Sequence, residues 1–71
     1  MTPAMTVFVN DQPRALAAGT ALVDLLRELG LAERKGVAIA INDEVVPRST
    51  WPLRPLADGE RILVIQATQG G

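Results

Sequence analysis

A single stretch of the chain has the spacing of an amphipathic helix, and strand-like segments lie on both sides of it. Its apolar residues recur at i, i+3, i+4 and i+7: Leu22, Leu25, Leu26 and Leu29. Thr20 suits the N-cap position and Gly30 suits the stop, so the spacing predicts a helix over 20–29. With one helix available, its leucine face must cover one face of a sheet.

Five short segments have the character of β-strands: residues 5–9 alternate and are rich in β-formers, and residues 37–41 place large side chains on one face and alanines on the other. They fall at residues 5–9, 14–17, 37–41, 44–46 and 61–66. Turn signals separate them at Asn10-Asp11, Asn42-Asp43 and Asp58-Gly59. Residues 47–52 have no regular pattern, and residues 53–56 are expected to cross the surface.

This order of elements predicts an α+β fold of the β-grasp, or ubiquitin-like, kind. Its mixed sheet would have four or five strands packed on one α-helix, with the first and last strands parallel in the centre. A ferredoxin-like fold would need a second helix, which we do not find. At 71 residues the chain is one domain, 1–71, with a folded body over 5–67 and a flexible tail over 68–71.

Strand periodicity divides the sheet's side chains between two faces. The inward set is Val7, Val9, Leu16, Ile39, Ile41, Ile62 and Val64. The outer set is Phe8, Ala38, Ala40, Leu63 and Ile65. A contiguous apolar patch on an outer face usually marks a partner site, although reversed faces or ordinary exposed apolar surface would also explain it. We predict a partner interface at Phe8, Ala40, Leu63 and Ile65, because the last two lie on the strand that leads to the tail.

Composition excludes several kinds of chemistry. The chain has no cysteine and no histidine, so it has no thiolate nucleophile, no disulfide and no imidazole base. Its carboxylates are scattered without metal-ligand spacing, so we predict neither catalytic residues nor a metal site. A net charge of −1 without a basic stripe argues against nucleic acid as a partner.

Membrane insertion and export have no support in the sequence either. The apolar runs AIAI and ILVI are far too short to cross a bilayer, and no signal-peptide pattern opens the chain. We therefore expect a cytoplasmic protein with no membrane partner. Trp51 is expected to plug the core beneath the crossover, and Arg48 and Arg54 are expected to be solvated charges, or else to meet an acidic partner.

The last strand is followed by a few polar residues and two glycines, QATQGG. A carboxylate is a poor electrophile, so an enzyme must activate it, for example as an acyl-adenylate, in a site that excludes water. Glycines have no Cβ and pass through a narrow channel. This reasoning predicts Gly71 as the modified residue and Thr68, Gln69 and Gly70 as the segment that threads into the partner.

Several motifs together resemble the ThiS family, the ubiquitin-like sulfur carriers of thiamine biosynthesis. They are Phe8-Val9-Asn10-Asp11, Ala38-Ile39-Ala40-Ile41-Asn42, Val46-Pro47-Arg48 with Trp51, Asp58-Gly59-Glu60-Arg61-Ile62-Leu63, and Gly70-Gly71. The stretch Val-Pro-Arg-x-x-Trp after Ala-Ile-Asn is the most discriminating of them. The resemblance begins at Met5, and residues 1–4 are extra.

The resemblance implies a carrier that is a co-substrate and not an enzyme. A ThiF-type adenylyltransferase would use ATP and magnesium to adenylate the Gly71 carboxylate. A persulfide donor, supplied by a cysteine desulfurase, would convert it into a thiocarboxylate. The thiazole synthase ThiG would then take the sulfur into the thiazole ring of thiamine. The carrier itself would bind no cofactor and would be a monomer when free.

Three other functions fit the same features. The small subunit of molybdopterin synthase has the same fold, tail and activation chemistry, although the Pro-Arg-x-x-Trp stretch favours the thiamine carrier. A ubiquitin-like protein modifier would also need an activated Gly71, which it would join to lysines. A β-grasp interaction module with an inert tail would tolerate residues added after Gly71.

Overall fold

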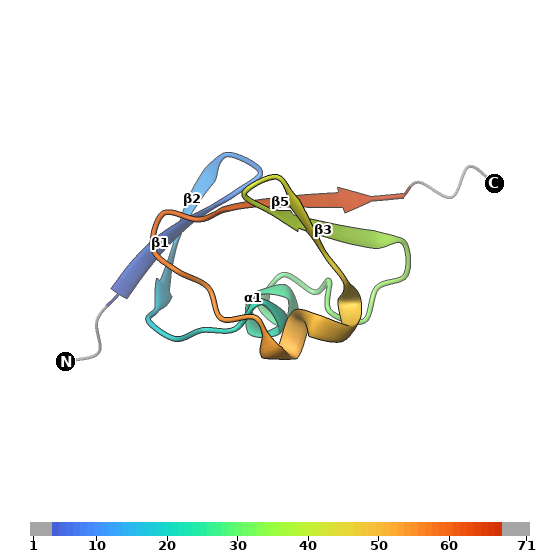
Figure 1. Cartoon of the computed structure of the whole chain (residues 1–71), viewed down its shortest axis with the longest axis horizontal. Coiled ribbons are helices and arrows are strands. Elements are labelled where there is room, and N and C mark those ends of the chain that lie inside the picture. Colours follow the sequence, from blue (N-terminus) through green and yellow to red (C-terminus); the bar gives the residue numbers. More distant parts are fainter. Residues whose placement is uncertain (1–3, 68–71) are drawn as a thin grey trace.

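The computed structural model describes residues 4–67, which form one sheet, one α-helix and one 3₁₀-helix. Along the chain these are β1 (Ala4–Val9), β2 (Gln12–Ala17), α1 (Leu22–Glu28), β3 (Val37–Ile41), β4 (Glu44–Val46), the 3₁₀-helix η1 (Arg48–Leu53) and β5 (Arg61–Gln66). The predicted bounds of β3, β4 and β5 are confirmed, and β1 and β2 each begin earlier than predicted. In Figure 1 the sheet forms one layer and the two helices lie together on one side of it.

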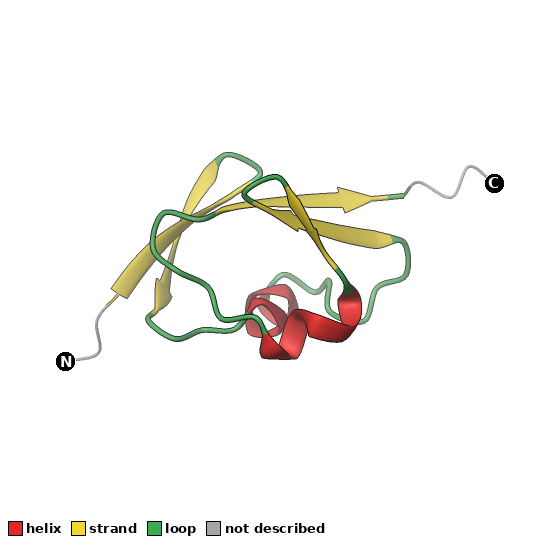
Figure 2. Ribbon diagram, viewed as in Figure 1, coloured by secondary structure: helices red, strands yellow, loops and turns green. Residues whose placement is uncertain are grey.

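The five strands lie in the order β2-β1-β5-β3-β4. β1 and β5 pair in parallel at the centre, and the other neighbouring strands pair antiparallel. The predicted mixed sheet with its first and last strands adjacent is confirmed. Figure 2 shows β5 running along the sheet, with its end directed away from the helices.

The core lies between the sheet and the helices. All the residues predicted to point inward belong to the hydrophobic cluster or pack against it. Three leucines of the helical stripe, Leu22, Leu25 and Leu26, are fully buried. Trp51 is 2% exposed and its indole Nε1 donates to the Val46 carbonyl at 3.0 Å, so its predicted role as a buried plug is confirmed. The face assignment made from strand period is therefore correct.

Helix α1 begins later than predicted, and Thr20 is not its N-cap. The Thr20 hydroxyl donates to the Ala17 carbonyl at 2.6 Å instead. Ala21 is extended because it forms a β-bridge with Pro55, and the first helical amide, that of Leu22, is satisfied by the Arg54 carbonyl at 2.8 Å. This long-range pairing removes the need for a side-chain cap.

The segment 47–56 has more regular structure than the sequence predicts. Residues Arg48–Leu53 form η1, which packs against α1 and contributes Trp51 to the core. The crossover that follows lies at the surface only in part. Leu53 is 80% exposed, whereas Leu56 is 5% exposed and its amide donates to the Thr20 carbonyl.

Candidate functional site

Strand β5 leads to the predicted tail, and two asparagine side chains form hydrogen bonds to the backbone of this strand. Asn10 and Asn42 each open a two-residue hairpin turn in which both central residues have positive φ, the geometry that suits Asn and Asp. The Asn10 Oδ1 accepts a hydrogen bond from the Val64 amide at 2.8 Å, and the Asn42 Oδ1 accepts one from the Arg61 amide at 3.0 Å. The two predicted turns therefore do more than reverse the chain, because their side chains fix β5 from both sides.

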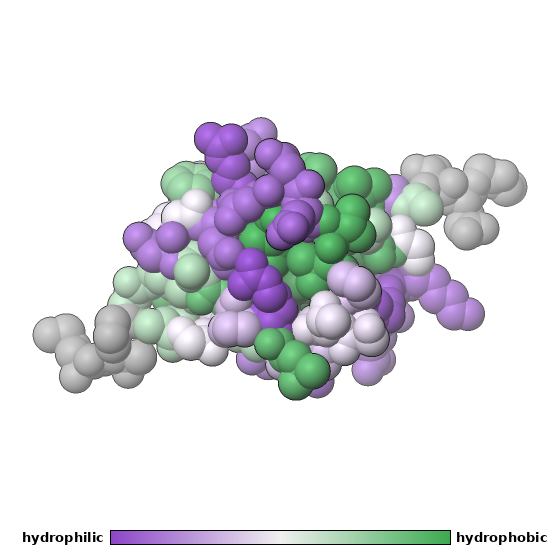
Figure 3. Space-filling view, in the orientation of Figure 1, coloured by the Kyte–Doolittle hydropathy of each residue, from purple (hydrophilic) through white to green (hydrophobic). Residues whose placement is uncertain are grey.

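An apolar patch lies on the outer face of the sheet, along β5. Leu63 is 49% exposed, Ile65 is 51% exposed and Phe8 is 36% exposed, as the sequence predicts for the outer face. Figure 3 shows hydrophobic side chains gathered over β3, β4 and β5, near the end of β5. We call Phe8, Leu63 and Ile65 the outer patch. Two of its three members, Leu63 and Ile65, are exposed apolar side chains on the strand that leads to the tail.

Ala40 does not belong to this accessible surface, contrary to the prediction. It lies on the outer face, but it is only 8% exposed. Its cross-strand neighbours are Leu63 on β5 and Val45 on β4, both larger, so the methyl group lies low between them. Val45 is 77% exposed and is the exposed side chain on that flank, which the sequence did not single out.

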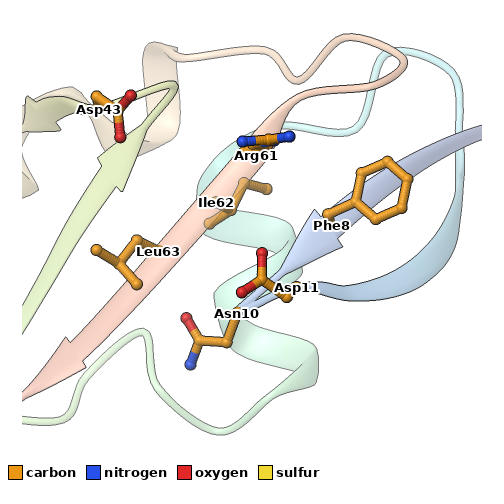
Figure 4. Close-up of a pocket in the computed structure, with 7 residues that line it drawn as sticks. All are labelled: Phe8, Asn10, Asp11, Asp43, Arg61, Ile62 and Leu63. Atoms are coloured by element: carbon orange, nitrogen blue, oxygen red, sulfur yellow. The ribbon is translucent and has the colours of Figure 1, made fainter.

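A small cavity of about 150 Å³ adjoins the outer patch, where the two hairpin turns meet β5 (Figure 4). It is lined by Phe8, Asn10, Asp11, Asp43, Arg61, Ile62 and Leu63. The sequence gives no reason to join Asp11 and Asp43, which are 32 positions apart in the numbering. The topology brings them to one cavity because β5 lies between the two hairpins.

The base of the tail is anchored to the loop before β3. The amide of Ala67, the last described residue, donates to the Gly36 carbonyl at 2.7 Å. Gly36 has φ +77, and a Cβ placed on it would lie 3.4 Å from the Ala67 Cβ. The backbone conformation therefore favours a glycine here, and a Cβ at this position would come into van der Waals contact with the end of β5.

Arg48 is exposed, as predicted for a solvated charge, but it also holds that loop in place, which the sequence did not predict. Its guanidinium donates to the carbonyls of Ala32 at 2.8 Å and Arg34 at 2.6 Å. It also lies over the Trp51 ring, 4.5 Å from the ring centroid. A planar guanidinium suits both tasks, because its donors form a fork and its face stacks on an aromatic ring.

Arg54 is half-buried and ion-paired to Glu60, so its prediction as a solvated charge is wrong. Its Nη2 donates to the Glu60 carboxylate at 2.8 Å, and the other Glu60 oxygen accepts the Ala57 amide at 2.7 Å. Glu60 is 8% exposed, so its charge needs these partners. The Arg54–Glu60 ion pair joins the two ends of the loop that leads into β5.

The remaining predicted site residues, Thr68, Gln69, Gly70 and Gly71, lie outside the described residues. Among residues 4–67, no group of three or more His, Cys, Asp or Glu side chains could hold a metal ion. No helix in this part of the chain is long and apolar enough to span a membrane. What the described residues provide is a braced strand, an apolar surface along it and a fixed starting point for the tail.

Comparisons with known proteins agree with this arrangement. Residues 7–71 match the sequence model of the ThiS family. The chain is 39% identical over 67 residues to the sulfur carrier protein ThiS of Escherichia coli, covering 94% of this chain and all of that protein. It is 42% identical over 65 residues to the sulfur carrier protein ThiS of Thermus thermophilus, covering 92% of this chain and 98% of that protein.

A solved structure has the same fold. The crystal structure of a thiamine biosynthesis protein, ThiS, from Geobacter metallireducens superposes with a TM-score of 0.79 at 26% sequence identity. The superposition covers 94% of this chain and all of the other. The predicted β-grasp fold is confirmed by this likeness together with the observed topology.

Proposed function

Because the chain belongs to the ThiS family and is a sulfur carrier of thiamine biosynthesis, we propose that it holds its sulfur as a thiocarboxylate on Gly71. The observation that supports this most directly is how β5 ends. The strand is braced by Asn10 and Asn42 and anchored at Ala67, so hydrogen bonds hold β5 as far as the last described residue. The body supplies binding energy, and the tail supplies the reacting atom.

The chemistry begins with activation of the terminal carboxylate by a ThiF-type adenylyltransferase. That enzyme uses ATP and magnesium to form the Gly71 acyl-adenylate and releases pyrophosphate. A persulfide sulfur, derived from cysteine through a desulfurase, then displaces AMP and forms an acyl disulfide. A thiol attacks the outer sulfur, is oxidised to a disulfide, and leaves the thiocarboxylate on Gly71. The chain has no cysteine, so both sulfur-bearing groups come from its partners.

Thiazole synthase is the proposed acceptor of this sulfur. Two proteins named thiazole synthase, from Paramagnetospirillum magneticum and Magnetococcus marinus, contain a segment that is 33% and 37% identical to this chain. The segment makes up 20% of each of those proteins. A physical link between such a domain and a thiazole synthase raises their effective concentration, which supports the same pairing between separate chains.

The outer patch is the proposed docking surface for the adenylyltransferase. Leu63 and Ile65 project from β5 only a few residues before the tail, so a partner that covers them also receives the tail. Phe8, on the neighbouring β1, extends the same surface. In this role the chain acts without catalytic residues or a bound cofactor of its own.

Intact-protein mass spectrometry tests the proposal. The chain is incubated with a ThiF-type adenylyltransferase, magnesium ATP, a persulfide source and a thiol that releases the acyl disulfide, and a mass gain equal to one oxygen replaced by sulfur, mapped to Gly71, is expected. The matched control is the same chain with one alanine added after Gly71, which removes the terminal glycine carboxylate and should remain unmodified. An unchanged mass of the native chain, with the enzyme active on its own carrier, would contradict the proposal.

A further inference from the structure

The parallel pairing between β1 and β5 stops abruptly after two residue pairs. β1 pairs with β5 at Phe8↔Arg61 and Val9↔Ile62, and the chain then turns away at Asn10. The Asn10 amide donates to the Ile62 carbonyl at 2.9 Å, and its side-chain oxygen accepts the Val64 amide at 2.8 Å. In a continued parallel strand a main-chain carbonyl would accept that amide. Where β1 ends, the Asn10 side chain therefore supplies the hydrogen-bond acceptor that a continued strand would have supplied.

Beyond this point β5 has an open edge. Gln66 lies opposite Val37 on β3, whereas the next residue, Ala67, bonds to Gly36. Because successive backbone amides of a strand point to opposite sides, the Gln66 N–H and C=O face away from β3, towards the side that β1 has left. Among residues 4–67, no strand pairs with β5 on this side beyond Val9↔Ile62.

A groove of about 390 Å³ runs beside this open edge. Val64 and Gln66 line it from β5, Val9 and Gln12 from the hairpin, and Leu29 and Arg34 from the segment after α1. The Arg34 side chain is at the surface and has no ion-pair partner among the described residues. Its backbone is fixed on both sides, since its amide donates to the Leu31 carbonyl and its carbonyl accepts from Arg48.

We propose that an extended segment of thiazole synthase binds in this groove and adds to β5 at Gln66. The open edge favours a partner segment with extended backbone, because the Gln66 N–H and C=O can form strand-type hydrogen bonds only with such a segment. Val9, Leu29 and Val64 select an apolar side chain, and the Arg34 guanidinium selects a carboxylate. The site adjoins the tail and is separate from the outer patch, so the acceptor and the adenylyltransferase bind different surfaces. This inference rests on the proposed function, because it requires thiazole synthase as the acceptor.

Amide hydrogen exchange of the ¹⁵N-labelled chain tests the proposal. With saturating thiazole synthase, exchange of the Gln66 amide is expected to slow at least tenfold. The Ala67 amide, already bonded to Gly36, is the internal reference. Unchanged exchange at Gln66 in the saturated complex would overturn the proposal. Protection by the adenylyltransferase but not by thiazole synthase would overturn the choice of partner.

A pair of substitutions at one position gives an independent test. Gln66→Pro removes the edge N–H and leaves the hydrogen bonds to β3 intact, whereas Gln66→Ala keeps the N–H. Binding to thiazole synthase is expected to weaken at least tenfold for Gln66→Pro and less than twofold for Gln66→Ala. Equal binding by the two variants would contradict the proposal. Both variants should still gain sulfur on Gly71, and a loss of that modification in the native chain would instead count against the proposed function.

Discussion

The Gly36 carbonyl accepts the Ala67 amide at 2.7 Å, and Gly36 has a φ of +77 at the point of contact. This bond joins the loop before β3 to the end of β5. It lies where the described chain stops and the predicted tail begins. The last described residue is therefore held by a loop that is 31 positions earlier in the numbering.

Gly36→Ala should disturb the base of the tail more than it disturbs the fold. The left-handed backbone would cost about 1–2 kcal/mol with a side chain present, and the new Cβ would lie in contact with the Ala67 Cβ, 3.4 Å away. The control is Gly30→Ala, where φ is +74 and nothing lies within 4 Å of the added Cβ. Denaturant unfolding should show similar losses for both variants. Only Gly36→Ala should slow sulfur transfer to Gly71, and equal transfer rates would contradict this role.

Arg48 should contribute measurable stability, unlike most surface arginines. Arg48→Ala removes two hydrogen bonds to loop carbonyls and the stacking on Trp51, and we expect a loss of about 1–2 kcal/mol in the free energy of unfolding. Arg48→Lys should recover less than half, because an ammonium cannot form the planar fork.

Arg27→Ala is the matched control for Arg48. Arg27 makes one exposed helical ion pair, to Asp24 at 3.5 Å, and its removal should cost less than about 0.5 kcal/mol. Chemical denaturation of the three arginine variants provides the comparison. A loss for Arg48→Ala no larger than that for Arg27→Ala would show that Arg48 is only the solvated charge that the sequence suggested.

Leu63→Asp and Ile65→Asp should weaken activation while leaving the fold intact. Both side chains are about half exposed, so a charge there costs little in the free protein but must be desolvated in a docked complex. We expect at least a tenfold loss of affinity for the adenylyltransferase. Leu53→Asp is the control, because Leu53 is 80% exposed on η1, outside the sheet. A marked fall in melting temperature with unchanged affinity would show that the outer patch is structural.

Local sequence patterns were sufficient to predict the sheet and its two faces. Strand β3 alternates large residues with alanines, β5 is a short apolar run, and turn residues at Asn42-Asp43 and Asp58-Gly59 mark where these strands begin or end; each of these signals spans only a few positions. The inward and outer sets follow from the same period. Ala40 was misjudged because its exposure depends on the size of Leu63 and Val45, which lie on other strands.

The roles of Thr20, Arg48 and Arg54 could not be predicted in this way. Each depends on groups that the fold brings from elsewhere. The Arg54 carbonyl satisfies the first amide of α1, the carbonyls of Ala32 and Arg34 receive the Arg48 guanidinium, and Glu60 is buried beside Arg54. The motif Val-Pro-Arg-x-x-Trp pointed to Arg48 and Trp51 as a unit, but only by resemblance. Their stacked geometry supplies the physical reason for that spacing.

The two asparagine side chains should protect different amides of β5, and exchange rates can separate them. Asn10→Gly keeps a residue suited to positive φ in the turn but removes the acceptor for the Val64 amide. Asn42→Gly does the same for the Arg61 amide. Each substitution should cost about 1 kcal/mol. Val64 should exchange faster only in the first variant and Arg61 only in the second, because each amide has its own acceptor. If either variant raised both rates equally, β5 would be opening as a whole, and the asparagines would not be holding it at separate points.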